Sequence, residues 1–453
     1  MKHFDAIIIG SGQAGTPLAF KLSGEGKNIA LIEKEHLGGT CLNEGCTPTK
    51  AYVASARRIW DAMHGDEMGI TIPPGAKANL KKIKNRKDAL IKTSLDGLNQ
   101  AIQKNDKLHL IEGLAKFVDN KTVEVNGDLL TADLIYINVG ARAVIPDMFA
   151  NIHYLTNKSI LELEEIPKHL IIMGGSYIGL EFGQMFKRFG SKVTIIETGE
   201  RLIYREDEEI SSSIHKFLSE EGIQFKLNTK CTHVQNNTDG ITLKLDMNGV
   251  ISEISGSHLL MAVGRRPNTD LLNLEKTDIK TNERGIIEVN DYLETSVKGI
   301  YALGDCNGKG AFTHTAYNDY EIIAEDWFDG KDRKVSDRII TYGLFIDPPL
   351  GRVGMTIREA KEKGYQIKTA HLPMSKIARA KEKGETHGFM SAVIDAKTNK
   401  ILGACILGVG GDEIISGIIN IMYAQQPYTV IRDSIVPHPT IAELIPTMLE
   451  SIK

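Results

Sequence analysis

Two closely spaced cysteines, Cys41 and Cys46, are the residues of this 453-residue chain whose type and spacing most directly suggest redox or metal chemistry. In an ideal helix, residues five apart are separated by roughly 7.5 Å along the axis, whereas the Cα atoms of a disulfide lie roughly 4.4 to 6.8 Å apart. A bridge between them therefore requires a local distortion. Gly45 supplies conformational latitude, and Pro48 disfavours helix at Thr47.

Two other interpretations of the pair are inert buried thiols and half of a zinc site. Zinc requires two further ligands, and no other close Cys or His pair in the sequence completes such a set, so we predict no metal site. The chain has five cysteines, an odd number spread over its length, which is not the disulfide framework of a secreted protein. We expect the remaining three, Cys231, Cys306 and Cys405, to be core or incidental residues.

A dinucleotide-binding pattern precedes the cysteines. The apolar segment 4–9 predicts a buried strand, and it leads into Gly10, Gly12 and Gly15 and then into an apolar-periodic helix; a second strand ends at Glu33. Glycines in such a turn let a pyrophosphate approach the helix N-terminus, while the acid can accept hydrogen bonds from a ribose. We predict a dinucleotide site here.

The same pattern returns at residues 170–197, with Gly174 and Gly179 in the turn and Glu197 at the end of the second strand. The offset from the first glycine to the acid is 23 positions in both copies. Ser176 stands where the pyrophosphate-facing glycine belongs, which narrows the space for the phosphates. A carboxylate at position 197 favours NADH over NADPH because it repels a 2′-phosphate; Arg201 and Arg205 lie close enough in sequence to reverse that preference.

Residues 38–50 read Gly-Gly-Thr-Cys-Leu-Asn-Glu-Gly-Cys-Thr-Pro-Thr-Lys, which resembles the active-site signature of the class I pyridine nucleotide-disulfide oxidoreductases. This family comprises dihydrolipoamide dehydrogenase, glutathione reductase and mercuric reductase. Three further blocks extend the resemblance over nearly the whole chain. They are residues 263–268 (Val-Gly-Arg-Arg-Pro-Asn), 301–305 (Tyr-Ala-Leu-Gly-Asp), and His438-Pro439-Thr440 followed by Glu443.

The resemblance implies two cofactors, FAD in the first unit and a nicotinamide nucleotide in the second. Asp305 would hold the ribityl chain of the flavin, and Tyr177 would cover the nicotinamide pocket as a gate, although an aromatic residue at that turn is also compatible with simple packing. The implied FAD-binding residues are Gly10, Gly12, Gly15, Glu33, Thr40, Lys50 and Asp305. The implied nicotinamide-site residues are Gly174, Ser176, Tyr177, Gly179, Glu197 and Gly264.

The resemblance also implies a catalytic set. Cys46 would be the flavin-facing thiol and Cys41 the interchange thiol that meets the substrate, so that two electrons pass from nicotinamide through flavin to a Cys41–Cys46 disulfide. Lys50 would lie near the reactive nitrogen of the flavin, paired with Glu181.

His438 and Glu443 would form a base dyad that keeps the interchange thiol ionised. The segment 440–443 is also a capping-box pattern for the last helix, and the two roles can coexist. In the family this dyad reaches the active site of the opposite subunit. The resemblance therefore predicts an obligate homodimer with two shared active sites.

The expected fold is α/β, with two Rossmann-like dinucleotide-binding domains and a C-terminal α+β dimerisation domain. Alternating apolar runs at 389–394 and 401–407, together with two helices, predict the sheet and helices of that last domain. The expected limits are 1–145 and 267–340 for the FAD domain, 146–266 for the NAD(P) domain and 341–453 for the dimerisation domain.

Composition excludes several kinds of partner. The formal charge is −4, which gives no reason to expect nucleic acid, and no apolar run is long enough to span a membrane. The N-terminus enters its first apolar strand without a cleavage site, so we expect a cytoplasmic protein. One basic cluster is interpreted as the solvated face of a helix: Lys77, Lys81, Lys82, Lys84, Arg86 and Lys87.

Segments 46–50, 310–315 and 347–354 look most like the bacterial mercuric reductase-like branch. However, the chain lacks the C-terminal cysteine pair of mercuric reductases, since no cysteine follows Cys405, and it keeps the His438–Glu443 dyad that they lack. We therefore predict reduction of a small disulfide or of a soft metal ion such as copper. Dihydrolipoamide dehydrogenase is the leading named alternative, although this chain has Glu44 and Thr47 where those enzymes usually have small apolar residues. The alternative of another class is a non-catalytic flavoprotein dimer that serves for interaction.

Overall fold

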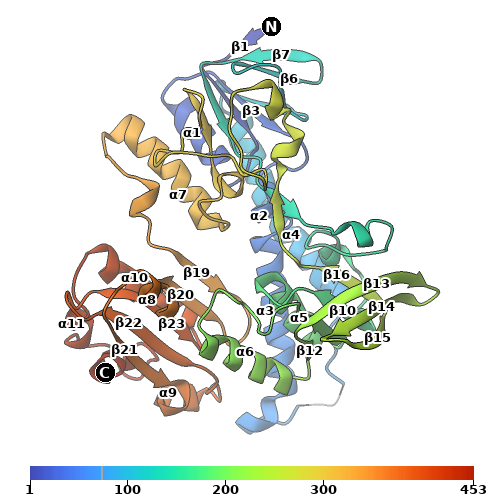
Figure 1. Cartoon of the computed structure of the whole chain (residues 1–453), viewed down its shortest axis with the longest axis vertical. Helices are drawn as coiled ribbons and strands as arrows, with labels where there is room; N and C mark the ends of the chain where they lie inside the picture. The colour runs from blue at the N-terminus through green and yellow to red at the C-terminus, as the bar shows by residue number, and fades with distance from the viewer. Residues whose placement is uncertain (73–74, 453) are drawn as a thin grey trace. The chain divides into compact units, whose positions relative to one another are not determined.

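The computed structural model describes residues 1–72 and 75–452, and by its internal contacts the chain divides into two compact units (Figure 1). Each unit is assembled from segments that are far apart in the sequence. Unit 1 consists of Met1–Ala51, Lys84–Val144 and Gly264–Arg338, and unit 2 consists of Tyr52–Ile83, Ile145–Val263 and Ile339–Lys453.

Unit 1 is built on a five-stranded parallel sheet. Its three central strands are short apolar runs that are almost fully buried, as parallel strands covered by helices must be. Helices α1 (Gly15–Gly24) and α7 (Thr313–Ala324) pack against each other in this unit (Figure 1). In spatial order the strands are β18 (Ile300–Ala302), β8 (Leu134–Ile137), β2 (Ala6–Ile9), β3 (Ile29–Glu33) and β4 (Leu108–Glu112).

Smaller elements complete unit 1. A four-stranded side sheet has the order β1 (Lys2–His3), β7 (Asp128–Thr131), β6 (Thr122–Val125) and β5 (Lys116–Phe117), and β9 (Ala141–Ala143) pairs with β17 (Arg265–Pro267). The cysteine segment forms the short helix α2 (Gly39–Asn43) and the start of the long helix α3 (Cys46–Met63), whose later turns are counted in unit 2.

The expectation that the basic cluster is a solvated helix face is wrong for part of it. Helix α4 (Leu80–Gln103) carries these residues except Lys77, which precedes it. The Lys87 side chain is only 1% exposed, and its Nζ lies 2.7 Å from Asp88. Arg86 donates a 3.0 Å hydrogen bond to the carbonyl of Ala51 in α3. The cluster therefore contributes to packing against the cysteine helix.

Unit 2 contains the second dinucleotide unit. Its parallel sheet has the order β12 (Gln224–Lys226), β11 (Lys192–Ile196), β10 (His169–Met173) and β16 (His258–Met261). Its helices are α5 (Tyr177–Phe189) and α6 (Glu208–Glu220), and an antiparallel sheet of β13 (Thr229–Asn237), β14 (Gly240–Met247) and β15 (Val250–Gly256) adjoins it (Figure 1).

The C-terminal part of unit 2 is a five-stranded antiparallel sheet with helices, as the alternating apolar runs predict. The strand order is β19 (Thr341–Leu344), β20 (Leu350–Gly354), β23 (Ile401–Leu407), β22 (Phe389–Asp395) and β21 (Ile367–Pro373). Its helices are α8 (Ile357–Glu362), α9 (Ala378–Glu382), α10 (Gly411–Tyr423), α11 (Thr429–Arg432) and α12 (Leu444–Glu450). The predicted α/β class with two Rossmann-like units and an α+β C-terminal domain is confirmed.

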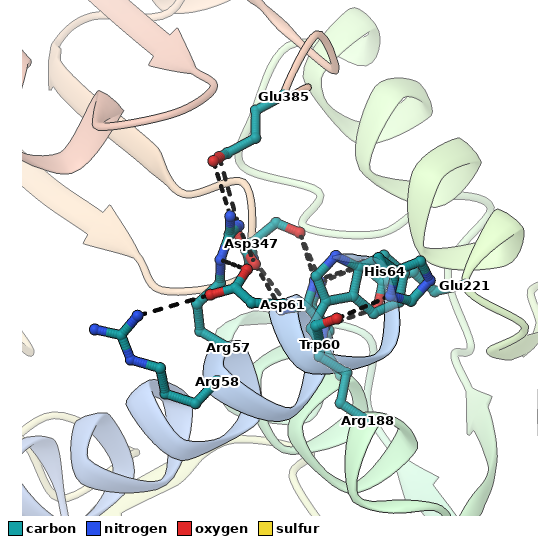
Figure 2. Close-up of polar contacts among 10 residues, drawn as sticks. Arg57, Arg58, Trp60, Asp61, His64, Arg188, Glu221, Asp347 and Glu385 are labelled. Carbon is teal, nitrogen blue, oxygen red and sulfur yellow. Dashed lines mark hydrogen bonds and ion pairs between the residues drawn. The ribbon is translucent and has the colours of Figure 1, made fainter. Parts of the chain in front are cut away.

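An ion cluster joins three parts of unit 2 around Asp347, which lies between β19 and β20 (Figure 2). Arg57 of α3 contacts Asp347 at 2.7 Å and Glu385 at 2.8 Å. Arg188 of α5 contacts Asp347 at 2.5 Å and Glu221 at 2.8 Å. Because one carboxylate serves two guanidinium groups, this Asp347 cluster fixes the later turns of α3 against α5.

Candidate functional site

The glycines of the first dinucleotide turn are required by space as well as by backbone angles. Gly10 has φ +103°, and a Cβ there would lie 2.3 Å from the carbonyl of Asn138; a Cβ at Gly15 would lie 2.1 Å from the carbonyl of Gly10. The buried Asn138 side chain accepts a 2.9 Å hydrogen bond from the Gly15 amide and donates one of 2.8 Å to the Leu303 carbonyl. Sequence reasoning missed Asn138, because a lone Asn after an apolar strand is not a distinctive signal.

Glu33, predicted to accept from a ribose, is positioned by the turn itself. Its Oε2 accepts from the amide (3.0 Å) and the hydroxyl (2.7 Å) of the buried Ser11. The same hydroxyl accepts a 3.0 Å hydrogen bond from the Gly38 amide, and a Cβ on Gly39 would lie 2.9 Å from the Cα of Gly12. The cysteine segment thus begins directly against the dinucleotide turn.

The second dinucleotide turn repeats this geometry. Gly174 has φ +106°, and a Cβ at Gly179 would lie 2.0 Å from the Gly174 carbonyl. Glu197 accepts from the Gly175 amide at 2.7 Å, as Glu33 does from the equivalent amide, and also from the Gly199 amide at 2.8 Å. Ser176, at φ −108°, is in a conformation that needs no glycine.

Both turns fit a dinucleotide. Helices α1 and α5, which the turns precede, have no acidic residue in their first turn and no side-chain cap. Their positive N-terminal ends therefore carry no competing negative charge, which suits a pyrophosphate group.

The two cysteines lie on either side of a break between helices. Cys41 is in α2, which ends at Asn43, and Cys46 is the first residue of α3. A Cβ on Gly45 would lie 2.8 Å from the Thr40 carbonyl and 3.2 Å from the Cα of Cys41. Gly45 is therefore needed for close approach of the two helices.

The expectation that Pro48 disfavours helix at Thr47 is wrong. Both residues lie in the first turn of α3. Proline is tolerated there because the first amides of a helix have no partner within it. The distortion that brings the cysteines together lies at residues 44–45.

Thr313, the first residue of α7, contacts both thiols. Its Oγ1 donates a 2.9 Å hydrogen bond to the Sγ of Cys41 and lies 3.3 Å from the Sγ of Cys46. The pKa of the Cys41 thiol is held well above its ordinary value, mainly because the thiol is hydrogen-bonded to Cys46 and buried, while Thr313 acts in the opposite direction. These surroundings therefore disfavour ionisation of a reduced Cys41.

Asp305 lies in the short helix η6 (Gly304–Asn307), after β18. Its Oδ2 is 2.8 Å from Nη1 of Arg265, and Nη2 of the same guanidinium donates a hydrogen bond to the Ala141 carbonyl. Gly264 has φ +131° with nothing near its position for a Cβ, so its glycine is required by the backbone. The Arg265–Asp305 pair was not predicted, although both residues lie in blocks that carry the resemblance.

Glu181 is 7% exposed on α5, where its Oε1 accepts a 3.0 Å hydrogen bond from the Phe345 amide. Lys50 lies near the start of α3, in unit 1. Their predicted ion pair stays a prediction. Tyr177, at the start of α5, packs edge-to-face against Tyr342 with ring centroids 5.6 Å apart.

The predicted dyad residues lie together in unit 2. Nδ1 of His438 is 2.9 Å from Oε2 of Glu443, and the His438 side chain is 78% exposed while that of Glu443 is 14% exposed. Thr440 Oγ1 accepts a 3.2 Å hydrogen bond from the Glu443 amide, as the capping-box pattern predicts. However, helix α12 begins only at Leu444. The Glu443 carboxylate contacts the imidazole instead.

Cys306 and Cys405 are fully buried and Cys231 is half-buried. Over residues 1–72 and 75–452, no group of three or more His, Cys, Asp or Glu side chains is arranged to hold a metal ion. In the same described ranges, no helix has both the length and the apolar character required to cross a membrane.

Comparisons with known proteins bear on this site. Residues 4–319 match the model of the pyridine nucleotide-disulphide oxidoreductase family, and residues 340–449 match its dimerisation domain. The chain is 34% identical to a mercuric reductase of Staphylococcus aureus over 97% of this chain and 81% of that one. It is 32% identical to the dihydrolipoyl dehydrogenase of Geobacillus stearothermophilus, over 97% and 94% of the two chains.

A third relative is known both by sequence and by structure. The chain is 34% identical over its full length to RclA of Escherichia coli, described as a probable pyridine nucleotide-disulfide oxidoreductase. The Cu(II) complex of that protein, described as an HOCl-induced flavoprotein disulfide reductase, superposes with a TM-score of 0.89 over 99% of each chain, at 32% identity. The chain therefore belongs to the pyridine nucleotide-disulphide oxidoreductase family of flavin-dependent enzymes and carries that family's dimerisation domain.

Proposed function

We propose that this enzyme oxidises NADH and delivers two electrons through a Cys41–Cys46 disulfide to a small disulfide or to a soft metal ion. The observation that carries the proposal is the contact of both thiols with the single Thr313 hydroxyl, which holds the two sulfurs at one place beside the first dinucleotide turn. Bound FAD would supply the step that converts a hydride into an electron pair for the disulfide.

The roles proposed for the chain's own residues are those that the family resemblance implies, and the surroundings of Cys41 and His438 support two of them. Cys41 is the interchange thiol, and its raised pKa explains why a base is needed. The exposed His438, oriented by Glu443, is that base, acting on the opposite subunit of a homodimer. Cys46 is the second thiol of the bridge, and Lys50 and Glu181 support the flavin side.

The domain limits and the remaining cofactor contacts are part of the same proposal. The FAD domain would comprise 1–145 and 267–340, the NAD(P) domain 146–266 and the dimerisation domain 341–453. FAD would be held by Gly10, Gly12, Gly15, Glu33, Thr40, Lys50 and Asp305, and the nicotinamide nucleotide by Gly174, Ser176, Tyr177, Gly179, Glu197 and Gly264.

Two acceptors satisfy the electron count. One NADH and one proton reduce one disulfide to two thiols; alternatively, one NADH reduces two Cu(II) ions to Cu(I) and releases a proton. Thiolate ligands favour Cu(I), and RclA has been solved as a Cu(II) complex, which supports copper as the soft metal.

NADH is proposed over NADPH because the Glu197 carboxylate stands at the end of β11. Arg201, which would favour a 2′-phosphate, donates to the Tyr204 carbonyl, and its guanidinium lies 4.7 Å from the centre of the Tyr204 ring. We expect kcat/KM to be higher for NADH than for NADPH. A clear preference for NADPH contradicts this part of the proposal.

The test is steady-state NADH oxidation by the FAD-replete protein against lipoamide, glutathione disulfide, other small disulfides, Cu(II) and Hg(II). Cys41→Ser should abolish turnover. Cys231→Ser is the matched control, because it removes a half-buried thiol outside the proposed site and should leave turnover unchanged.

The possible outcomes distinguish the candidate activities. Strong turnover of one disulfide, lost in Cys41→Ser, identifies a dedicated disulfide reductase, or the dihydrolipoamide enzyme if that disulfide is lipoamide. Turnover with Cu(II) and not with disulfides identifies a metal reductase. Oxidation of NADH that is equally fast in Cys41→Ser would show that the cysteine pair does not carry the electrons.

A further inference from the structure

The ring of Tyr177 rests on a second tyrosine that sequence reasoning did not single out. Tyr342, in β19, meets it edge-to-face at a centroid distance of 5.6 Å and an interplanar angle of 86°. Both side chains are half-buried. Burial is the main cause that raises the pKa of Tyr177 to about 12, so its phenol stays protonated at neutral pH.

The Tyr342 hydroxyl is itself positioned by a buried ion pair. Its hydroxyl donates a 2.5 Å hydrogen bond to Oε1 of Glu206, and Oε2 of Glu206 accepts from Nη2 of Arg352 at 2.5 Å and from its Nε at 3.1 Å. Glu206 is 0% exposed and Arg352 1%. A buried carboxylate with both oxygens engaged cannot rotate freely, and it fixes the Tyr342 hydroxyl.

The backbone that follows Tyr342 is also hydrogen-bonded to side chains of α5. The Phe345 amide donates to Glu181 at 3.0 Å, and the Asp347 amide donates to Oε1 of Gln184 at 2.8 Å. Glu181 and Gln184 are three residues apart and so lie on one face of α5, the helix that Tyr177 begins. These hydrogen bonds therefore fix the position of the segment that follows Tyr342 relative to α5 and to Tyr177.

We propose that Tyr342 is a positioning residue that holds the ring of Tyr177 in the position seen in this structure, so that a nicotinamide must break the contact between the two rings in order to bind. This inference rests on the proposed gate role of Tyr177. Tyr342 lies at the start of the dimerisation domain, so this segment would directly affect the affinity for the nicotinamide nucleotide. Glu206 and Arg352 would influence that affinity only by holding Tyr342 in place.

The experiment is a double-mutant cycle read as the Kd of NAD⁺, measured by calorimetry on the FAD-replete protein without turnover. Tyr342→Ala should lower that Kd about two- to tenfold, the range that an edge-to-face aromatic pair supports. In a Tyr177→Ala background, the same substitution should have no effect. Tyr342→Phe keeps the ring and removes the hydroxyl, with its hydrogen bonds to Glu206 and to the Tyr177 phenol, so it should give a smaller decrease.

Tyr292→Phe is the matched control, because Tyr292 also donates its phenol to a carboxylate, that of Asp332, but in unit 1 and at the surface. It should leave the Kd unchanged. If Tyr342→Ala does not fold, the cycle of Tyr177→Phe and Tyr342→Phe replaces it, and the proposal then requires the effect of Tyr342→Phe to be smaller in the Tyr177→Phe background.

Equal shifts in both backgrounds, or no shift in either, overturn this inference while leaving the proposed function intact. Failure of the wild-type protein both to bind NAD⁺ and to oxidise NADH overturns the proposed function and this inference together.

Discussion

At the scale of single residues, Thr313 is placed to tune the cysteine pair. Its hydrogen bond lowers the pKa of Cys41, against the larger upward effects of Cys46 and burial. Thr313→Val removes the hydroxyl at nearly constant volume, and since one hydrogen bond is worth about 0.5–1.5 kcal/mol, the rate of Cys41 alkylation should fall about two- to tenfold near neutral pH.

The measurement is the pH dependence of iodoacetamide labelling of the reduced protein, which should shift to higher pH in Thr313→Val. Thr313→Ser keeps the hydroxyl and should label like the wild type. Identical profiles for valine and wild type would show that Thr313 does not influence the thiol.

At the scale of elements, the Asp347 cluster links helices α3 and α5 (Figure 2). Burial acts to raise the pKa of Asp347, but Arg188 and Arg57 outweigh it and hold the pKa below its ordinary value of 3.8. A carboxyl group whose pKa is lower in the folded state than in the unfolded state stabilises the fold at pH values above its unfolded-state pKa. This contribution is lost as the pH falls through the folded-state pKa.

Asp347→Asn leaves the buried Arg188 and the half-buried Arg57 with less counter-charge, so we expect a loss of about 3–5 kcal/mol of stability at neutral pH. The melting temperature should also depend less on pH below 3.8 in the variant than in the wild type. Asp96→Asn removes an exposed partner of Lys92 and should change the melting temperature little. Parallel pH profiles for Asp347→Asn and wild type would contradict the role assigned to the cluster.

The elements also show what could be predicted from the sequence. Repeated local patterns predict the strand, turn, helix and strand of both dinucleotide units, because each unit is determined by neighbouring residues. Ser11, Asn138 and Thr313 were missed because their partners lie 22 to 272 positions away, so that their contacts depend on sheet order. Pro48 indicates a non-helical Thr47, but the first turn of α3 tolerates proline because the first amides of a helix have no partner within it.

At the scale of the whole molecule, the dimerisation domain and the exposed His438 lead us to predict active sites shared between subunits. Cys41→Ser and His438→Gln homodimers should each be nearly inactive with a disulfide substrate. When they are mixed and reassembled, half of the dimers are heterodimers with one intact site of two, so activity should recover to about a quarter of the wild type. No recovery, despite heterodimers detected by mass, would place Cys41 and His438 of one subunit in the same site.

The most direct test of the central claim counts thiols. The chain has five cysteines, so the air-oxidised protein, unfolded in denaturant, should show three thiols if Cys41 and Cys46 are bridged. After anaerobic treatment of the FAD-replete protein with NADH it should show five, because one NADH and one proton reduce one disulfide to two thiols. Cys41→Ser should show four thiols before and after. A count that NADH does not change in the wild type would contradict the account.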